Sequence, residues 1–146
     1  MTDSVPTLGT SLEAEHRELD QLLGRFLAAV TAGDGDAAGA ALKEFDEILR
    51  SHMRREEERL YGKPAGRKLV PGQDQAAETP WRELLLEHVQ IREVSGMMRR
   101  LLEEKRDLAA ARALCGNLAR RWEAHTNREE REVFPSFGQE VDEQRA

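Results

Sequence analysis

The chain has 146 residues and a net charge of −6, and 34% of its residues are charged. This length suits one domain with a sizeable core, the acidic balance argues against a nucleic-acid surface, and no apolar run is long enough to span a membrane. The first residues show neither the basic nor the apolar region of a secretory leader, so we expect none. A lone cysteine, Cys115, excludes an internal disulfide. We therefore expect one cytoplasmic domain over residues 1–146, with a bundle core at about 10–137, a flexible arm at 1–9 and a flexible tail at 138–146.

Two segments in the first half of the chain carry apolar residues at helical spacing. The first opens at Thr10, which forms a capping-box pattern with Glu13, and the second begins near Asp34 or Asp36. The positions expected to face a core are Leu12, His16, Leu19, Leu23, Phe26 and Val30 in the first segment, and Leu42, Phe45, Leu49, His52, Glu56 and Leu60 in the second.

The second half of the chain repeats this organisation. The third helix is predicted to start at Thr79-Pro80, with proline at the first helical position, and the fourth runs from near Asp107 to Phe134-Pro135. The expected interior positions are Trp81, Leu84, His88, Ile91, Ser95, Met98 and Leu102, followed by Leu108, Ala111, Cys115, Leu118, Trp122, His125, Glu129 and Val133.

Four amphipathic helices without a convincing strand predict an all-α protein. Short turns within each half favour an antiparallel up-down-up-down four-helix bundle built from two hairpins, with one long connection at 62–78. In this topology the starts of the odd helices and the ends of the even helices meet at one end of the bundle.

The four histidines are the only ones in the chain, and they follow the duplication. His16 and His88 are 72 positions apart, and His52 and His125 are 73 apart. Each of the first pair sits in a Glu-His dipeptide, and each of the second pair is followed four residues later by a glutamate, Glu56 or Glu129 in turn. Residues four apart lie on one helix face, so the topology brings all six side chains to one level inside the bundle.

A single histidine on an apolar face is most often a core residue, but four at one level beside two buried carboxylates favour a metal site. Burying two glutamates costs several kcal/mol per uncompensated charge, and cations offset that cost. Six nitrogen and oxygen ligands are too many for one tetrahedral zinc and too rich in nitrogen for calcium or magnesium. They divide naturally over two first-row ions with bridging carboxylates and an oxide or hydroxide bridge. Iron is the first choice, and manganese or zinc are possible.

The segments Glu15-His16-Arg17-Glu18-Leu19, His52-Met-Arg-Arg-Glu56-Glu57, Glu87-His88 and His125-Thr-Asn-Arg-Glu129-Glu130, with Phe134-Pro135, resemble the hemerythrin-like HHE cation-binding family. The resemblance covers about residues 10–137. It implies a four-helix bundle with a non-heme di-iron centre that meets dioxygen, nitric oxide or peroxide. Carried over to this chain, the implied metal ligands are His16, His52, Glu56, His88, His125 and Glu129.

One position departs from the oxygen-carrying members of that family, which have a fifth histidine four residues after the one in the third helix. Here that position is Arg92, so the chain is closer to the four-histidine, two-glutamate branch. We expect a small diatomic or peroxide ligand at an open iron position, without long-lived reversible oxygen carriage. Iron storage or delivery, and iron-redox sensing through a protein partner, are the alternatives without turnover.

Other polar residues near the predicted site have simpler expected roles. Asp20 and Arg92 are equivalent in the duplication and either pair across the core, with Asp20 alternatively reaching a metal, or lie on a solvated flank. Glu57 and Glu130 are about 140° around the helix from their histidines and are expected at the surface. Cys115 is expected to fill the core.

Overall fold

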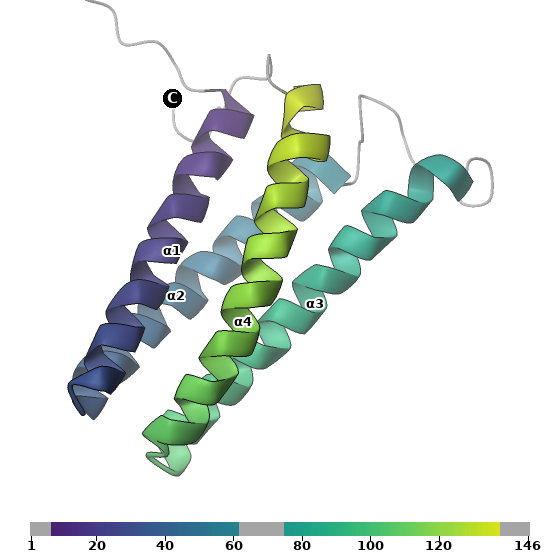
Figure 1. Ribbon diagram of the computed structural model, residues 1–146. Helices are drawn as coiled ribbons and strands as arrows, with labels where there is room; N and C mark the ends of the chain where they lie inside the picture. The colour runs from purple at the N-terminus through teal and green to yellow at the C-terminus, as the bar shows by residue number, and fades with distance from the viewer. Residues whose placement is uncertain (1–6, 62–74, 138–146) are drawn as a thin grey trace, which may run out of the picture.

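The computed structural model describes residues 7–61 and 75–137. Four helices, α1 (Leu8–Thr31), α2 (Gly35–Glu56), α3 (Gln75–Glu104) and α4 (Leu108–Arg128), run alternately up and down (Figure 1). α1 packs on α2 and α4, and α3 packs on the same two helices. The predicted all-α four-helix bundle is therefore confirmed. None of the described helices combines the length and apolar character that a membrane span requires.

Two helices begin earlier than the sequence indicated. The N-cap of α1 is Thr7, whose hydroxyl accepts a hydrogen bond from the backbone N–H of Thr10, so Thr10 lies inside the helix. Leu8 and Gly9 are buried in its first turn, which corrects the expectation of a flexible arm for those residues. α3 begins at Gln75, before the predicted Thr79-Pro80 start. Residues 1–6, most of the expected long connection, and the expected tail lie outside the described residues.

The helices that carry the His-x-x-x-Glu motifs both change their winding at the motif. α2 passes into a π-helical segment, η1 (Glu57–Tyr61), and α4 into η3 (Glu129–Val133), followed by a 3-10 turn, η4 (Phe134–Phe137). Short π segments inside helices occur often at functional sites. The fourth helix was predicted to end at Phe134-Pro135; α4 itself ends at Arg128, and the chain stays helical through η3 and η4 to Phe137. The sequence did not indicate either π segment.

The two hairpin turns at the far end of the bundle are also related. Asp34 and Asp107 cap α2 and α4, each accepting a hydrogen bond from the backbone N–H three residues on. The backbone has positive φ at Gly33 (73°) and at Arg106 (49°), which are equivalent positions in the duplication. Only Gly33 adopts this left-handed conformation without a steric cost.

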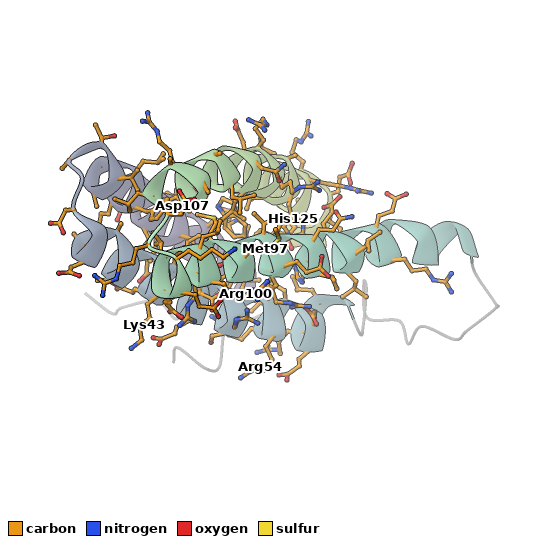
Figure 2. All side chains as sticks on the ribbon, turned by 90° about the horizontal axis from the view of Figure 1, so that it is seen from below. Lys43, Arg54, Met97, Arg100, Asp107 and His125 are labelled. Atoms are coloured by element: carbon orange, nitrogen blue, oxygen red, sulfur yellow. The ribbon has the colours of Figure 1, made fainter. Side chains whose placement is uncertain are left out.

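The buried apolar side chains form two groups. The larger group, which we call the body core, fills most of the bundle and includes Leu22, Phe26, Phe45, Met98 and Trp122. The smaller group, the end cluster, closes one end and consists of Leu8, Leu12, Leu60, Leu84, Val133 and Phe134. Charged side chains such as Lys43, Arg54 and Arg100 are exposed, and those of Lys43 and Arg54 project outward at the edge of the bundle in Figure 2.

Candidate metal centre

The six residues predicted as metal ligands come together in a layer between the two apolar groups. All six are buried, and the exposed fraction of both glutamates is 0%. They form two overlapping sets in which the potential ligand atoms lie within 4.8 Å of one another: His16, His52, Glu56 and Glu129, and His88, His125, Glu56 and Glu129. The structure therefore brings together every residue of the predicted site, with the two glutamates common to both sets.

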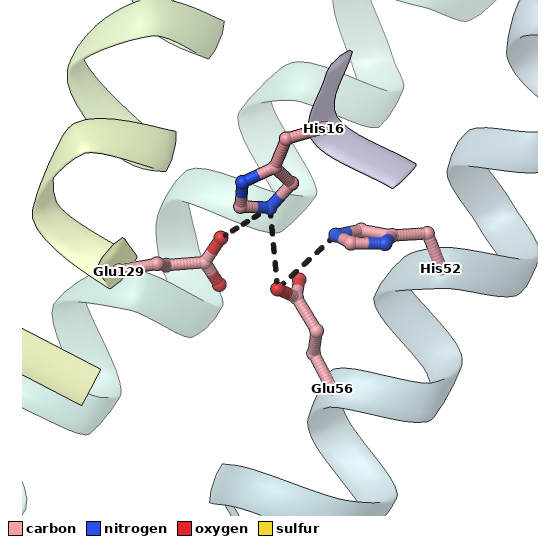
Figure 3. Close-up of side chains that lie close together, drawn as sticks. All are labelled: His16, His52, Glu56 and Glu129. Atoms are coloured by element: carbon pink, nitrogen blue, oxygen red, sulfur yellow. Dashed lines mark ion pairs between the residues drawn. The ribbon is translucent and has the colours of Figure 1, made fainter. Parts of the chain in front are cut away.

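The distances place each glutamate between the two hairpins. Glu56 lies one turn after His52, and its carboxylate is 3.1 Å from Nε2 of both His52 and His88. Glu129 is 3.2 Å from Nε2 of both His125 and His16. The remaining cross-distances, His16 to Glu56 and His88 to Glu129, are 3.6 Å. Figure 3 shows His16 from α1, His52 and Glu56 from α2, and Glu129 from η3, whose side chains point toward one another.

The nitrogen and oxygen atoms that face the centre of this layer are suited to binding a cation. Nε2 of His16, His52 and His125 and both carboxylate oxygens of Glu56 are buried without a hydrogen-bond partner. Buried polar atoms of this kind normally have partners, because leaving one unsatisfied costs about 1–3 kcal/mol. Imidazole nitrogens and carboxylate oxygens are ligands of first-row transition metals. Bound cations would satisfy these atoms and neutralise the carboxylates.

A second ring of carboxylates holds the outer nitrogens of the histidines. The Nδ1 atom of His52 is 2.8 Å from Glu15, and that of His125 is 2.7 Å from Glu87. His88 Nδ1 is 2.8 Å from Glu57. A carboxylate only accepts, so each of these rings donates from Nδ1–H, and in the neutral ring this leaves the lone pair of Nε2 facing inward. This tautomer is the one that binds metal through Nε2, and such carboxylates orient the ring and raise its basicity.

Arginines in turn support three of these carboxylates. Arg55 donates to Glu15 at 2.6 Å, Arg128 donates to Glu87 at 3.1 Å, and Arg92 donates to Glu57 at 2.8 Å. Each array thus runs from an arginine through a glutamate to a histidine. The two Glu-His dipeptides are the sequence feature that indicates part of this arrangement. Each dipeptide supplies one ligand histidine, and its glutamate binds the other histidine of the same hairpin.

Two expectations for this ring are corrected. Glu57 was expected at the surface, yet it binds His88 while its side chain stays 32% exposed. Glu130, 33% exposed, lies 3.5 Å from Nδ1 of His16. Each of these glutamates does lie about 140° around its helix from the histidine of its own motif. The flank on which these glutamates lie, however, faces the neighbouring hairpin, where the outer nitrogen of another histidine is within reach.

Asp20 and Arg92 do not pair with each other. Asp20 accepts a hydrogen bond from the indole N–H of Trp122 at 2.8 Å, and Arg92 binds Glu57 and contacts the sulfur of Met53 at 3.8 Å. Of the alternatives for these two residues, neither the ion pair across the core nor a direct approach of Asp20 to the ligand sets is found among the described residues. Arg92 instead supports the outer nitrogen of His88.

Without metal, the layer is a network of buried ion pairs. Burial alone would lower the pKa of His16, but Glu129 and Glu56 outweigh it and raise that pKa to about 10. The same balance, with Glu57 added, raises the pKa of His88 to about 11. Burial and the neighbouring Glu56 would raise the pKa of Glu129, but His125 and His16 lower it to about 2. Protons on the imidazoles therefore take the place of cations between the carboxylates.

Aromatic rings border this layer, and their shortest contacts are with His16. The ring centroid of His16 is 5.3 Å from those of Trp122 and Phe134. Cys115 is buried in the body core, and burial raises the pKa of its thiol to about 11. It is a core side chain, as expected, and not part of either ligand set.

A comparison with known families supports a metal-binding role for this layer. The model of the Hemerythrin HHE cation binding domain matches residues 6–63, which include α1 and α2 with His16, His52 and Glu56. No curated protein and no solved structure shows a significant match. The first hairpin is therefore similar in sequence to the hemerythrin HHE cation-binding domain, and the fold places a second, equivalent set of ligands opposite it.

Proposed function

We propose that the protein is a hemerythrin-like, non-heme di-iron protein that binds or reacts with dioxygen, nitric oxide or peroxide at an open iron position. The observation that carries this proposal is the pair of buried two-histidine sets joined by Glu56 and Glu129. Each ion would be held by two imidazoles together with the two glutamates that belong to both sets. This division would leave coordination positions on each ion for a small ligand.

The choice of iron rests on ligand chemistry. Mixed imidazole and carboxylate ligands suit iron, manganese and zinc. They argue against calcium and magnesium, which prefer sites made of oxygen ligands alone. Bound iron would supply a Lewis acid and an electron source. The chain itself supplies orientation and exclusion of bulk water, through the buried ligand layer and the end cluster above it. We place this function in the cytoplasm, since the single cysteine suits a reducing compartment.

The direct test is metal analysis of freshly purified protein combined with its optical spectrum. Two irons per chain with near-ultraviolet charge-transfer bands are the expected result. If the protein still holds only one ion per chain, or none, after it has been loaded with iron, the proposal is overturned. The Glu58→Ala variant, altered at an exposed residue beside the motif, is the control and should keep full occupancy.

A kinetic test separates reaction from storage. The iron-loaded, reduced protein is mixed with nitric oxide or hydrogen peroxide, and ligand consumption is followed beyond one equivalent per site. Continued consumption identifies turnover, and a single equivalent identifies binding or sensing. Loss of the iron during the reaction would instead favour storage or delivery.

A further inference from the structure

The duplication that supplies the ligands is unequal in the residues behind them. Three histidines have an outer nitrogen held by a glutamate that an arginine supports, in the arrays Arg55–Glu15–His52, Arg128–Glu87–His125 and Arg92–Glu57–His88. The first two arrays are equivalent to each other in the duplication. The residues equivalent to the third array are Asp20, Glu130 and His16, and they do not form such an array.

His16 lacks the support that the other three histidines have. Its Nδ1 is 3.5 Å from Glu130, and that atom has no hydrogen-bond partner. The position equivalent to Arg92 is Asp20, which carries the opposite charge. Asp20 cannot support a glutamate, and its carboxylate accepts the indole N–H of Trp122 instead. A single charge reversal between the halves thus removes one array of four.

Aromatic packing takes the place of the missing array. The Trp122 ring meets His16 edge-on, with an interplanar angle of 81°, and Phe134 lies over it at 30°. These contacts limit where the imidazole can turn. They do not accept the Nδ1 proton, so they do not raise the basicity of Nε2 as a carboxylate does.

The difference falls on one ion position. The position of His88 and His125 has two supported imidazoles, whereas the position of His16 and His52 has one. Loss of one such outer partner typically costs 10–100-fold in metal affinity. The two glutamates are common to both positions and cannot compensate for the difference.

We propose that the two ion positions are unequal, the one at His88 and His125 filling first and the one at His16 and His52 holding its ion more weakly. Arg92 is a positioning residue for the stronger position, acting through Glu57. Asp20 keeps the weaker position weak. This inference rests on the proposed two-ion function and adds which ion is exchangeable and why.

The test is a titration of the metal-depleted full chain with Co²⁺, followed by calorimetry and visible absorption. The first ion is expected to bind about 10–100-fold more tightly than the second. Asp20→Arg gives the first half the arginine that the second half has at the equivalent position 92, so it should reduce the difference in affinity between the two ions. Arg92→Gln should lower the affinity for the first ion toward that for the second. Asp20→Asn keeps an acceptor for Trp122 without adding a cation, so it should preserve the difference.

A second readout uses only the wild-type protein, so it does not depend on any variant folding. In the Co²⁺-loaded protein, each ligand imidazole contributes one exchangeable, hyperfine-shifted Nδ1–H proton signal. Three of these should exchange slowly with solvent and one, that of His16, should exchange quickly. Two ions of equal affinity, or four equally slow protons, would overturn the inference alone. Binding of fewer than two ions would overturn the proposed function as well.

Discussion

The body core and the end cluster lie on opposite sides of the ligand layer and are held together differently. Four helices surround the body core along its length, and it contains large fully buried side chains such as Phe26, Phe45 and Trp122. The end cluster has only six described members, drawn from the ends of the helices and from η1, η3 and η4. Apolar burial stabilises in proportion to area, so among the described residues the body core contributes more of this stabilisation than the end cluster does.

The ligand layer therefore has opposite effects on the two groups. Two fully buried carboxylates beside the small end cluster are a local cost unless cations or protons neutralise them. Metal bound in the layer would hold helix ends together in the region where fewer of the described apolar side chains are buried. We expect metal to stabilise the end cluster strongly and the body core little.

The largest effect is expected from removing the carboxylates that join the two ion positions. The double variant Glu56→Ala with Glu129→Ala should bind at most one ion and should lose the stabilisation that metal gives to the folded state. Metal analysis and thermal unfolding with and without metal measure both. The double variant Glu58→Ala with Glu123→Ala, altered at exposed positions of the same two motif-bearing chain segments, should behave like the wild type. Two ions bound without the bridging pair would contradict the ligand assignment.

Acidity should separate the metal-free from the metal-loaded protein. In the metal-free protein the pKa values of His16 and His88 are raised from 6.5 to about 10 and 11. Their stabilising contribution is therefore complete below pH 6.5 and lost as the pH rises through 10 to 11. The pKa of Glu129 is lowered from 4.5 to about 2, so its contribution is complete above pH 4.5 and lost as the pH falls toward 2.

Metal-free protein should thus be most stable between about pH 4.5 and 6.5. Metal requires neutral imidazoles, so the extra stability of the loaded protein should grow with pH and vanish in acid. Melting temperatures between pH 4 and pH 9, taken with chelator and with metal, check this. Parallel pH profiles in the two series would show that protons and metal do not compete for the layer.

A matched pair of substitutions in α1 compares the two apolar groups directly. Leu12→Ala removes a side chain of the end cluster, and Leu22→Ala makes the same change in the body core. Each should cost about 2–5 kcal/mol of unfolding free energy. Leu22→Ala should cost the same with and without metal, whereas Leu12→Ala should cost more with metal because it loosens the turn that carries His16. Urea unfolding under both conditions gives the four values, and an equal metal dependence would remove the distinction.

The smallest effect is expected at a charged group inside the body of the bundle. Asp46 is buried and accepts hydrogen bonds from Arg50, Ser95 and Arg99, each at 2.9 Å. Asp46→Asn should cost about 1–2 kcal/mol, since both arginines are partly exposed. It should leave metal affinity unchanged. A loss of metal in this variant would show that the body and the ligand layer are coupled.

The sequence predicted the helices and the ligand layer because both depend on spacing within one helix. Positions such as Phe45, Leu49, Met98 and Leu118 repeat at three and four residues and are buried as expected. The start of α1 was misplaced because threonines recur three residues apart at 7 and 10. Burial of Leu8 against the end cluster favours the earlier start.

The outer carboxylates were harder to predict, because their role depends on how one helix faces another. Spacing relates Glu57 to His52 on its own helix, but the structure relates Glu57 to His88 on α3. The π segments have no distinct apolar period, so a search for helical spacing passes over them. What spacing cannot supply is the relation between elements that are distant in sequence.

Sharing of the two glutamates has a consequence for symmetry. Each hairpin has two histidines and one glutamate of the layer, so neither hairpin completes an ion position alone. Two identical hairpins related by a two-fold axis would complete both positions, and the axis would make the two ions equivalent. Joining the hairpins in one chain removes that constraint, because each half then changes independently. A single chain can therefore hold one ion tightly and exchange the other, whereas a symmetric dimer of two identical hairpins cannot.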